Sequence, residues 1–169
     1  MVILYIKRLS AILAFFFVFI GCAVTPELRD SLDPYEEQNR KVHEFNERVI
    51  ENLIEPVTGA YVEATPPFVR DRITDFFENI DDVKSGLNNI LQENFSKALN
   101  DFGRFIFNTT FGIFGLFDVA TPMGFDKNDE DFGQTLGKWG VEPGPYIVLP
   151  FLGPTTVRDG LSRGIDSVI

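Results

Sequence analysis

The chain has 169 residues and a formal net charge of −10, with 25 Asp and Glu against 15 Lys and Arg. This acidic balance argues against nucleic acid as a partner, because phosphate binding needs a basic surface, and against adhesion to anionic lipid through a basic face. With 18 Phe, the protein has either a very aromatic core or an exposed apolar surface that becomes buried in its surroundings.

Cys22, the only cysteine, follows a leader typical of exported proteins. Lys7 and Arg8 precede an apolar run over 11–20, which indicates a secretory signal and is too short for a spanning helix. Phe19-Ile20-Gly21 lacks the small-x-small pattern of ordinary cleavage sites and resembles the lipobox of bacterial lipoproteins. We therefore expect lipidation of Cys22 with diacylglycerol and palmitate. The alternative is an ordinary signal peptide with a stray buried cysteine.

Cleavage before Cys22 would remove residues 1–21 as a lipoprotein signal peptide and leave 148 residues, enough for one domain. The leader holds two basic and no acidic residues, so 13 Lys and Arg would remain against 25 Asp and Glu, a formal charge of −12. Ala23 follows the cysteine where aspartate would signal retention, which by resemblance to enterobacterial sorting rules favours the outer membrane. Residues 22–32 are expected to form a tether.

Helical patterns follow the tether. Asp33 is predicted to cap a helix with Pro34 in its first turn and Glu36 in a capping box. Its apolar face is spaced 3-4-4 and extends to a predicted break at Pro56; it consists of Val42, Phe45, Val49 and Leu53.

Thr65-Pro66 repeats the start signal, and apolar periodicity predicts three more helices over 68–80, 83–91 and 95–106. The second of these is weakened by Gly86. No stretch alternates apolar and polar residues long enough to indicate a sheet. The predicted fold class is all-α.

Two segments are unusual for a soluble helical domain. Residues 105–117 contain 13 residues without a charge, and residues 143–157 contain 15 with four prolines. Thirteen helical residues cover about 20 Å, short of the roughly 30 Å hydrocarbon core of a bilayer. Both segments could be interfacial, re-entrant or buried core. For the first we predict contact with lipid, through Phe107, Phe111, Phe114 and Phe117.

Residues 126–131 read as a charged, solvated loop, and no catalytic, metal or cofactor site is expected. The calcium-loop spacing in this stretch fails because Asp131 occupies the glycine position and Gly137 the glutamate position. His43, the sole histidine, has no partner cluster and is predicted to lie at the surface. At the far end Val157, Leu161, Ile165 and Val168 begin a helix that stops without a C-cap signal, so we expect a truncated chain.

Ordered glycine and proline motifs cover about residues 33–165. They are Asp33-Pro34-x-Glu36, Asn39-Arg40, Phe45-Asn46, Gly103-Arg104-Phe105, Asn108-Thr109-Thr110-Phe111-Gly112, Gly115-Leu116-Phe117-Asp118-Val119-Ala120, Asp129 to Val141, Gly144 to Pro150, Leu152-Gly153-Pro154 and Val157-Arg158-Asp159-Gly160. Together they resemble the MlaA/VacJ family of outer-membrane lipoproteins, and we assign residues 33–169 to a domain of that kind.

The resemblance implies a ring-like helical assembly embedded in one membrane leaflet, with Gly/Pro-rich irregular segments, enclosing a phospholipid channel. It implies trimeric outer-membrane porins and a soluble periplasmic lipid carrier as partners, and removal of misplaced phospholipids from the outer leaflet. The predicted mouth of the channel, or a tight turn at its edge, contains Asp131, Gly133, Gly137, Trp139 and Gly140. The alternative for these residues is a role in folding alone. The alternatives are an adaptor lipoprotein that binds porins without moving lipid and, more distantly, an envelope hydrolase dependent on His43.

Overall fold

The computed structural model describes residues 33–167. The chain divides into two units, Met1–Pro34 and Tyr35–Ile169, and the described helices and strands belong to the second. The predicted signal peptide, the tether and Cys22 lie outside the described residues.

One continuous rod opens this unit. It consists of α2 (Glu36–Val49), the π-helical turn η2 (Ile50–Ile54) and α3 (Glu55–Ala64). The N-cap is Tyr35, so the prediction of Asp33 at that position is wrong. The predicted break at Pro56 is also wrong. The π turn shifts the hydrogen-bond register directly before Pro56, which then occupies the first turn of α3, where its missing N–H costs little.

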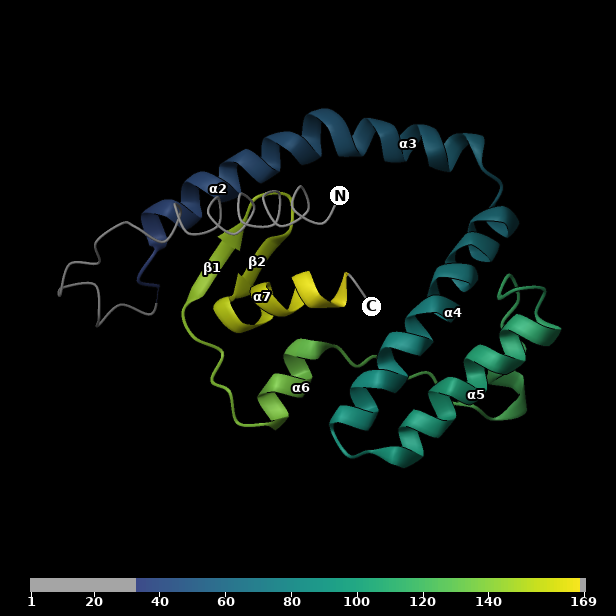
Figure 1. Ribbon diagram of the computed structural model, residues 1–169. Coiled ribbons are helices and arrows are strands. Elements are labelled where there is room, and N and C mark those ends of the chain that lie inside the picture. The colour runs from purple at the N-terminus through teal and green to yellow at the C-terminus, as the bar shows by residue number, and fades with distance from the viewer. Residues whose placement is uncertain (1–32, 168–169) are drawn as a thin grey trace, which may run out of the picture. The chain divides into compact units, whose positions relative to one another are not determined.

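A helical hairpin follows, formed by α4 (Pro67–Leu91) and α5 (Phe95–Phe111), which lie side by side (Figure 1). The two helices predicted over 68–80 and 83–91 are therefore one. Gly86 does not interrupt α4, and its missing side chain lets α5 pack closely against the helix. A Cβ at this position would lie 3.0 Å from the ring of Phe102 on α5.

The chain turns sharply where α5 ends. Ile113, Phe114 and Gly115 all have positive φ, at 54°, 57° and 87°. Such a left-handed run cannot continue a helix, so Phe114 does not share the helical face of Phe107 and Phe111 that its spacing predicted. The 3₁₀ turn η3 (Thr121–Met123) and a loop over 125–131 follow, as the charge pattern predicts for 126–131.

The last elements are α6 (Phe132–Lys138), the antiparallel strands β1 (Tyr146–Leu149) and β2 (Gly153–Thr156), and α7 (Val157–Asp166). The strands pair from Tyr146 opposite Thr156 to Leu149 opposite Gly153. The sequence did not predict this hairpin, because each strand is too short to display an alternating pattern.

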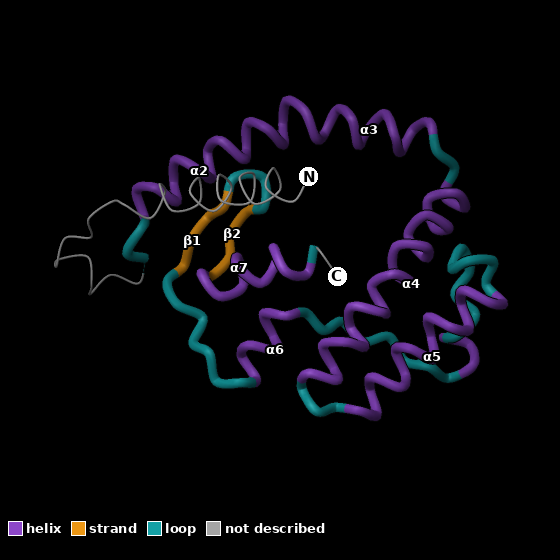
Figure 2. The backbone as a smooth tube through the Cα atoms, in the orientation of Figure 1, coloured by secondary structure: helices purple, strands orange, loops and turns teal. Residues whose placement is uncertain are grey.

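These elements form a closed circuit in the unit, as Figures 1 and 2 show. The rod turns into α4, α4 contacts α6, α6 packs on α7, α7 contacts the hairpin, and β1 contacts α2. The prediction of a ring-like, mainly helical fold is confirmed, and the β-hairpin is the only β-structure of its circuit within residues 33–167.

Candidate functional site

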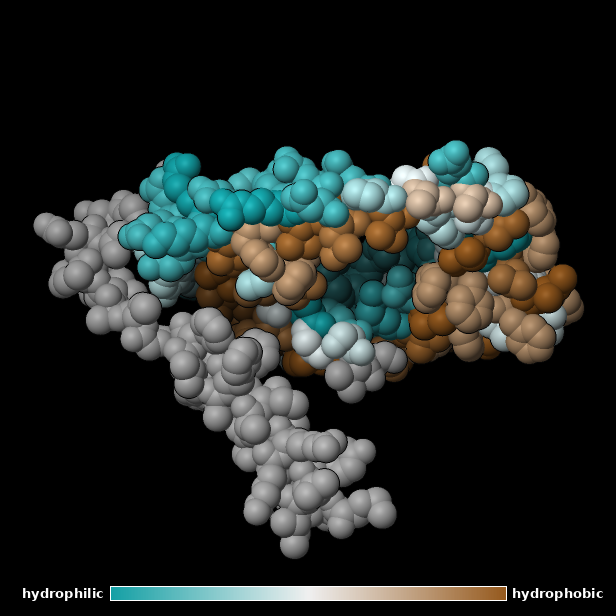
Figure 3. All heavy atoms as spheres, turned by 90° about the horizontal axis from the view of Figure 1, so that it is seen from above, coloured by the Kyte–Doolittle hydropathy of each residue, from teal (hydrophilic) through white to brown (hydrophobic). Residues whose placement is uncertain are grey.

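Large apolar side chains lie on the outside of the unit. Leu99 and Phe114 are each 74% exposed, and Phe151 is 73% exposed. Figure 3 shows hydrophobic residues gathered over much of one face, bordered by a hydrophilic edge. Among the described residues, the only fully buried hydrophobic side chains are those of Ala98, Ala120 and Val148.

The interior is polar instead. Its buried side chains carry amides, carboxylates, hydroxyls and a guanidinium, and include Asn39, Asn46, Asn79, Asp82, Ser85, Asn88, Asn89, Asp101, Arg104, Asn108, Thr135, Thr155 and Ser162. A water-soluble domain shows the reverse distribution. Each large apolar side chain left in water forgoes about 1.5–3 kcal/mol of burial, so this exterior needs an apolar environment.

No helix among residues 33–167 is both long enough and apolar enough to cross a membrane. The exposed apolar side chains are distributed over helices and turns around the circuit. Such a surface suits partial insertion into lipid or cover by another protein surface.

Arg104 on α5 is the centre of the largest buried polar network. It is 1% exposed and forms ion pairs with Asp82 at 3.2 Å and Asp118 at 3.1 Å. It also donates to Thr121 Oγ1 at 2.8 Å and to the carbonyl of Phe125 at 2.7 Å. One side chain thereby fixes α4, α5 and the loop that follows α5.

The pKa values of the two carboxylates in this network, Asp82 and Asp118, are shifted in opposite directions. Burial raises the pKa of Asp82 to about 6, against the attraction of Arg104 and Lys127. Burial also acts on Asp118, but hydrogen bonds from Thr121 and Arg104 outweigh it and hold the Asp118 pKa at about 2. Asp118 is therefore firmly anionic, whereas Asp82 can take up a proton under mildly acidic conditions.

A second polar contact joins α4 to α6. Thr135 Oγ1 donates to Asn88 Oδ1 at 2.8 Å, and Gln92 Nε2 donates to Thr135 Oγ1 at 3.2 Å. Trp139 Nε1 donates to the carbonyl of Leu91 at 3.0 Å while its ring remains 54% exposed. This contact holds α6 against the end of α4.

Two asparagines close the circuit between α2 and β1. Asn39 accepts from the amide of Val148 at 2.8 Å, and Asn46 accepts from the amide of Phe151 at 2.8 Å. Asn46 also donates to the carbonyl of Leu149 at 2.9 Å. The side-chain amides thus take the place of a neighbouring strand at the edge of β1 that does not face β2, so backbone groups there are not left unpaired.

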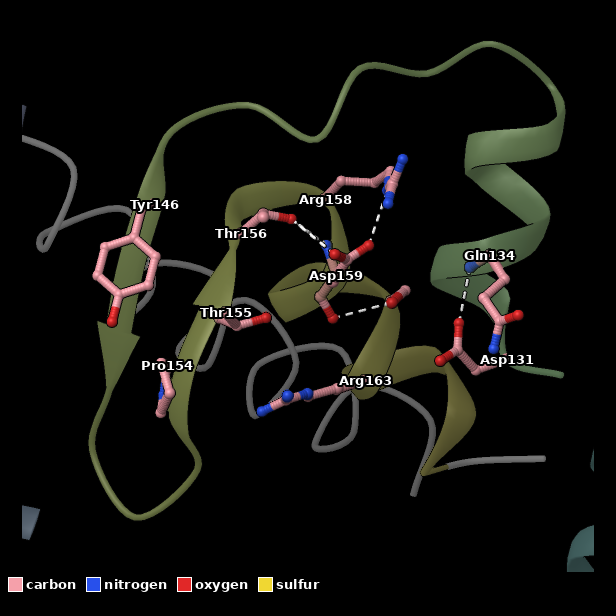
Figure 4. A pocket seen from close by; sticks show the side chains of 10 residues that line it. Asp131, Gln134, Tyr146, Pro154, Thr155, Thr156, Arg158, Asp159 and Arg163 are labelled. Carbon is pink, nitrogen blue, oxygen red and sulfur yellow. Dashed lines mark hydrogen bonds and ion pairs between the residues drawn. The ribbon is translucent and has the colours of Figure 1, made fainter. Parts of the chain in front are cut away.

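A cavity of about 460 Å³ lies between α6, β2 and α7. Figure 4 shows Asp131 and Gln134 on its α6 side, with Thr155, Asp159 and Arg163 around the opposite wall. Arg158 Nε donates to Asp159 at 2.7 Å, and this hydrogen bond lowers the pKa of the Asp159 carboxyl. The cavity is polar and open to the outside.

Glycine allows this cavity wall to form. A Cβ on Gly133 would lie 2.8 Å from both Asp159 Oδ1 and Ser162 Oγ and 3.1 Å from Asp131 Oδ1. A Cβ on Gly137 would lie 2.9 Å from Arg158 Nη1. A side chain at Gly133 would have to displace Asp159 and Ser162 of α7, whereas one at Gly137 would meet only the flexible end of Arg158.

The residues predicted for a channel mouth lie partly in α6 or at its N-cap and partly in the turn that follows α6. Asp131 caps α6 by accepting from the amide of Gln134, and Gly133 and Gly137 lie inside that helix rather than in a turn. Gly140 has a φ of +86° and forms the turn after α6, next to Trp139.

The residues predicted to contact lipid are unequally exposed. Phe111 and Phe114 are 67% and 74% exposed. Phe107 and Phe117 are partly covered: Phe107 stacks with Phe111, and Phe117 lies under the guanidinium of Arg72 at 4.5 Å. Their contact with lipid stays a prediction.

The sequence reasoning gave no role to the buried polar residues. A usable signal was present on α4, where Asn79, Asp82, Ser85 and Asn89 recur at helical spacing opposite the apolar stripe. Short side chains of this kind suit a packed interior better than Lys and Glu do. His43 is exposed, as predicted, and no group of His, Cys, Asp and Glu within residues 33–167 could hold a metal ion.

Comparison with known proteins gives consistent matches. The model of the family described as MlaA lipoprotein matches residues 31–169. An uncharacterized protein of Rickettsia conorii is 42% identical over 127 residues, which are 75% of this chain and 51% of that protein. The intermembrane phospholipid transport system lipoprotein MlaA of Escherichia coli K12 is 34% identical over 157 residues, covering 90% of this chain and 62% of that protein.

A solved structure also matches, with a TM-score of 0.72 and 33% identity over 81% of this chain and 71% of the other. It is described as the structural basis for maintenance of bacterial outer membrane lipid asymmetry. The chain thus spans between half and two thirds of the length of the curated relatives cited above.

Proposed function

Because the chain belongs to the MlaA lipoprotein family, we propose that it acts in an outer-membrane lipoprotein that removes misplaced phospholipids from the outer leaflet. In this proposal the lipids pass to a soluble periplasmic carrier, which maintains lipid asymmetry. No bond is made or broken, so the protein is a transport component rather than an enzyme. The names of its relatives and of the matching structure support this reading.

The reversed distribution of polar and apolar side chains is the observation that carries the proposal. An apolar exterior without a spanning helix suits a ring that sits in one leaflet. The buried polar side chains bond to one another, as Arg104 does to Asp82 and Asp118, so the ring is held together without an apolar core. A ring held together in this way can present its apolar side chains to lipid, as the proposed function requires.

Attachment to the membrane would have two sources. Cys22 would carry diacylglycerol and a further acyl chain such as palmitate, and each buried methylene adds about 0.8 kcal/mol. The exposed aromatic residues would add their own burial in the leaflet. This second source distinguishes the protein from a soluble domain on a lipid tether.

The partners proposed are trimeric porins on the apolar side and a periplasmic carrier on the polar side. Polar, largely charged residues on α2, among them Glu36, Glu37 and Glu44, form an exposed face. That face would lie towards the periplasm, where it avoids the cost of burying charge in lipid.

Two measurements on the full-length protein test the function. Cells that lack the gene should accumulate outer-leaflet phospholipid, and restoring the gene should reverse this. The purified protein should retain phospholipid in native mass spectrometry. Normal outer-leaflet composition in the deletion strain, or a protein that binds porin but never retains lipid, would favour an adaptor instead.

A further inference from the structure

Two charged side chains in the cavity between α6, β2 and α7 form no ion pair with another residue of 33–167, although one of them, Arg163, also attracts Asp159 from a greater distance. The other charged pair of the cavity, Arg158 and Asp159, is joined at 2.7 Å and is electrically satisfied. What remains is Asp131 from the α6 side and Arg163 from α7 (Figure 4). The cavity thus offers one negative and one positive group to a ligand.

Both groups have bonding capacity left. Asp131 uses Oδ1 to cap α6, and no hydrogen bond to its Oδ2 occurs among the described residues. Arg163 donates through Nη1 to the carbonyl of Leu152 at 3.1 Å, which leaves its other N–H groups for a ligand.

An orphaned hydroxyl lies in the wall of the same cavity. Thr155 is 9% exposed, and its Oγ1 is buried without a hydrogen-bond partner in the described part of the chain. Its side chain extends from β2 towards α7, where a Cβ on Gly160 would meet its methyl group at 3.2 Å. Buried polar groups are nearly always paired, so this hydroxyl indicates a missing partner.

We propose that this cavity binds the headgroup of a zwitterionic phospholipid, with the phosphate at Arg163 and Thr155 and the primary ammonium at Asp131. The cavity volume of about 460 Å³ accommodates a headgroup of this kind. The inference rests on the proposed function and names the headgroup class that this function would select.

The test uses full-length protein in detergent and three probes: short-chain phosphatidylethanolamine, short-chain phosphatidylglycerol and free phosphoethanolamine. Wild type should bind the ethanolamine lipid roughly tenfold more tightly than the glycerol lipid, the difference expected for one charge-assisted hydrogen bond. Free phosphoethanolamine should bind much more weakly than the lipid. Equal binding of free headgroup and lipid would show that the site recognises a soluble phosphate compound, and would overturn the proposal.

Two variants separate the two charges. Asp131→Asn keeps the helix cap, since Asn caps as well as Asp, and should abolish the preference for ethanolamine while glycerol lipid binds as before. Arg163→Gln should weaken both lipids by roughly tenfold. The matched controls Asp71→Asn and Arg48→Gln alter exposed charges on α4 and α2 and should change neither quantity.

The outcomes distinguish a failure of the headgroup site from a failure of the proposed lipid transport. Phospholipid retained without headgroup preference, or a preference that survives Asp131→Asn, overturns the headgroup site and leaves lipid transport intact. No retained phospholipid in wild type overturns both. A thermal melt of each variant identifies any loss of binding that comes from unfolding.

Discussion

Replacing Asn46 with leucine would test whether the amide contacts hold the circuit closed. Asn46 is 6% exposed, and the substitution removes its hydrogen bonds to Leu149 at 2.9 Å and to Phe151 at 2.8 Å. One carbonyl and one amide of the hairpin would be left without partners. Because Phe151 is 73% exposed and Leu149 is only partly covered, water can replace part of each bond, so the expected local loss is that of two ordinary hydrogen bonds, about 1–3 kcal/mol.

Hydrogen exchange of the protein in detergent measures the local stability at single backbone amides of the hairpin. The amide of Phe151 should exchange roughly tenfold faster in Asn46→Leu, since about 1.4 kcal/mol corresponds to a factor of ten. The amide of Val148, bound by Asn39, should be affected less. Asn52→Leu is the control, because Asn52 is exposed and donates only within the rod. Unchanged exchange at Phe151 would refute the role given to Asn46.

Four further outcomes are expected. Arg104→Met should lower the free energy of unfolding by about 3–5 kcal/mol, because buried Asp82 would keep only its longer ion pair with Lys127, at 3.7 Å. A change under 1 kcal/mol in chemical denaturation would contradict the network. The folded state raises the pKa of Asp82 from its ordinary value of 3.8 to about 6, so between these values the folded protein binds more protons than the unfolded chain. The contribution of Asp82 to stability should therefore fall as pH rises from 4 to 6 and then level off. Thermal melts across that range should lose this dependence in Asp82→Asn. Gly115→Ala should destabilise more than Gly124→Ala, since both glycines have positive φ but only the first Cβ would collide, at 2.5 Å from Asn79, and equal melting temperatures would exclude the steric account. Cys22→Ala, exported from a cleavable signal peptide, should still need detergent for extraction, and recovery as a monodisperse protein in buffer would show that the aromatic surface is covered.

Local pattern alone determined most of the helices and the absence of familiar catalytic and metal motifs. The apolar periodicity over 95–106 predicted most of α5, and the spacing of Val157, Leu161 and Ile165 predicted α7. The prolines over 143–157 excluded a regular helix there. These features depend on neighbours within a few residues, which is why a sequence can reveal them.

The tertiary structure decided which side of each helix is buried. The amphipathic pattern of α4 is the same whether its apolar stripe faces a core or lipid, because periodicity does not state which face lies inside. Only the contacts among Asp82, Arg104 and Asp118 show that the polar stripe is the packed one. The closure of β1 against Asn39 and Asn46 is equally invisible in sequence, because it joins residues more than 100 positions apart.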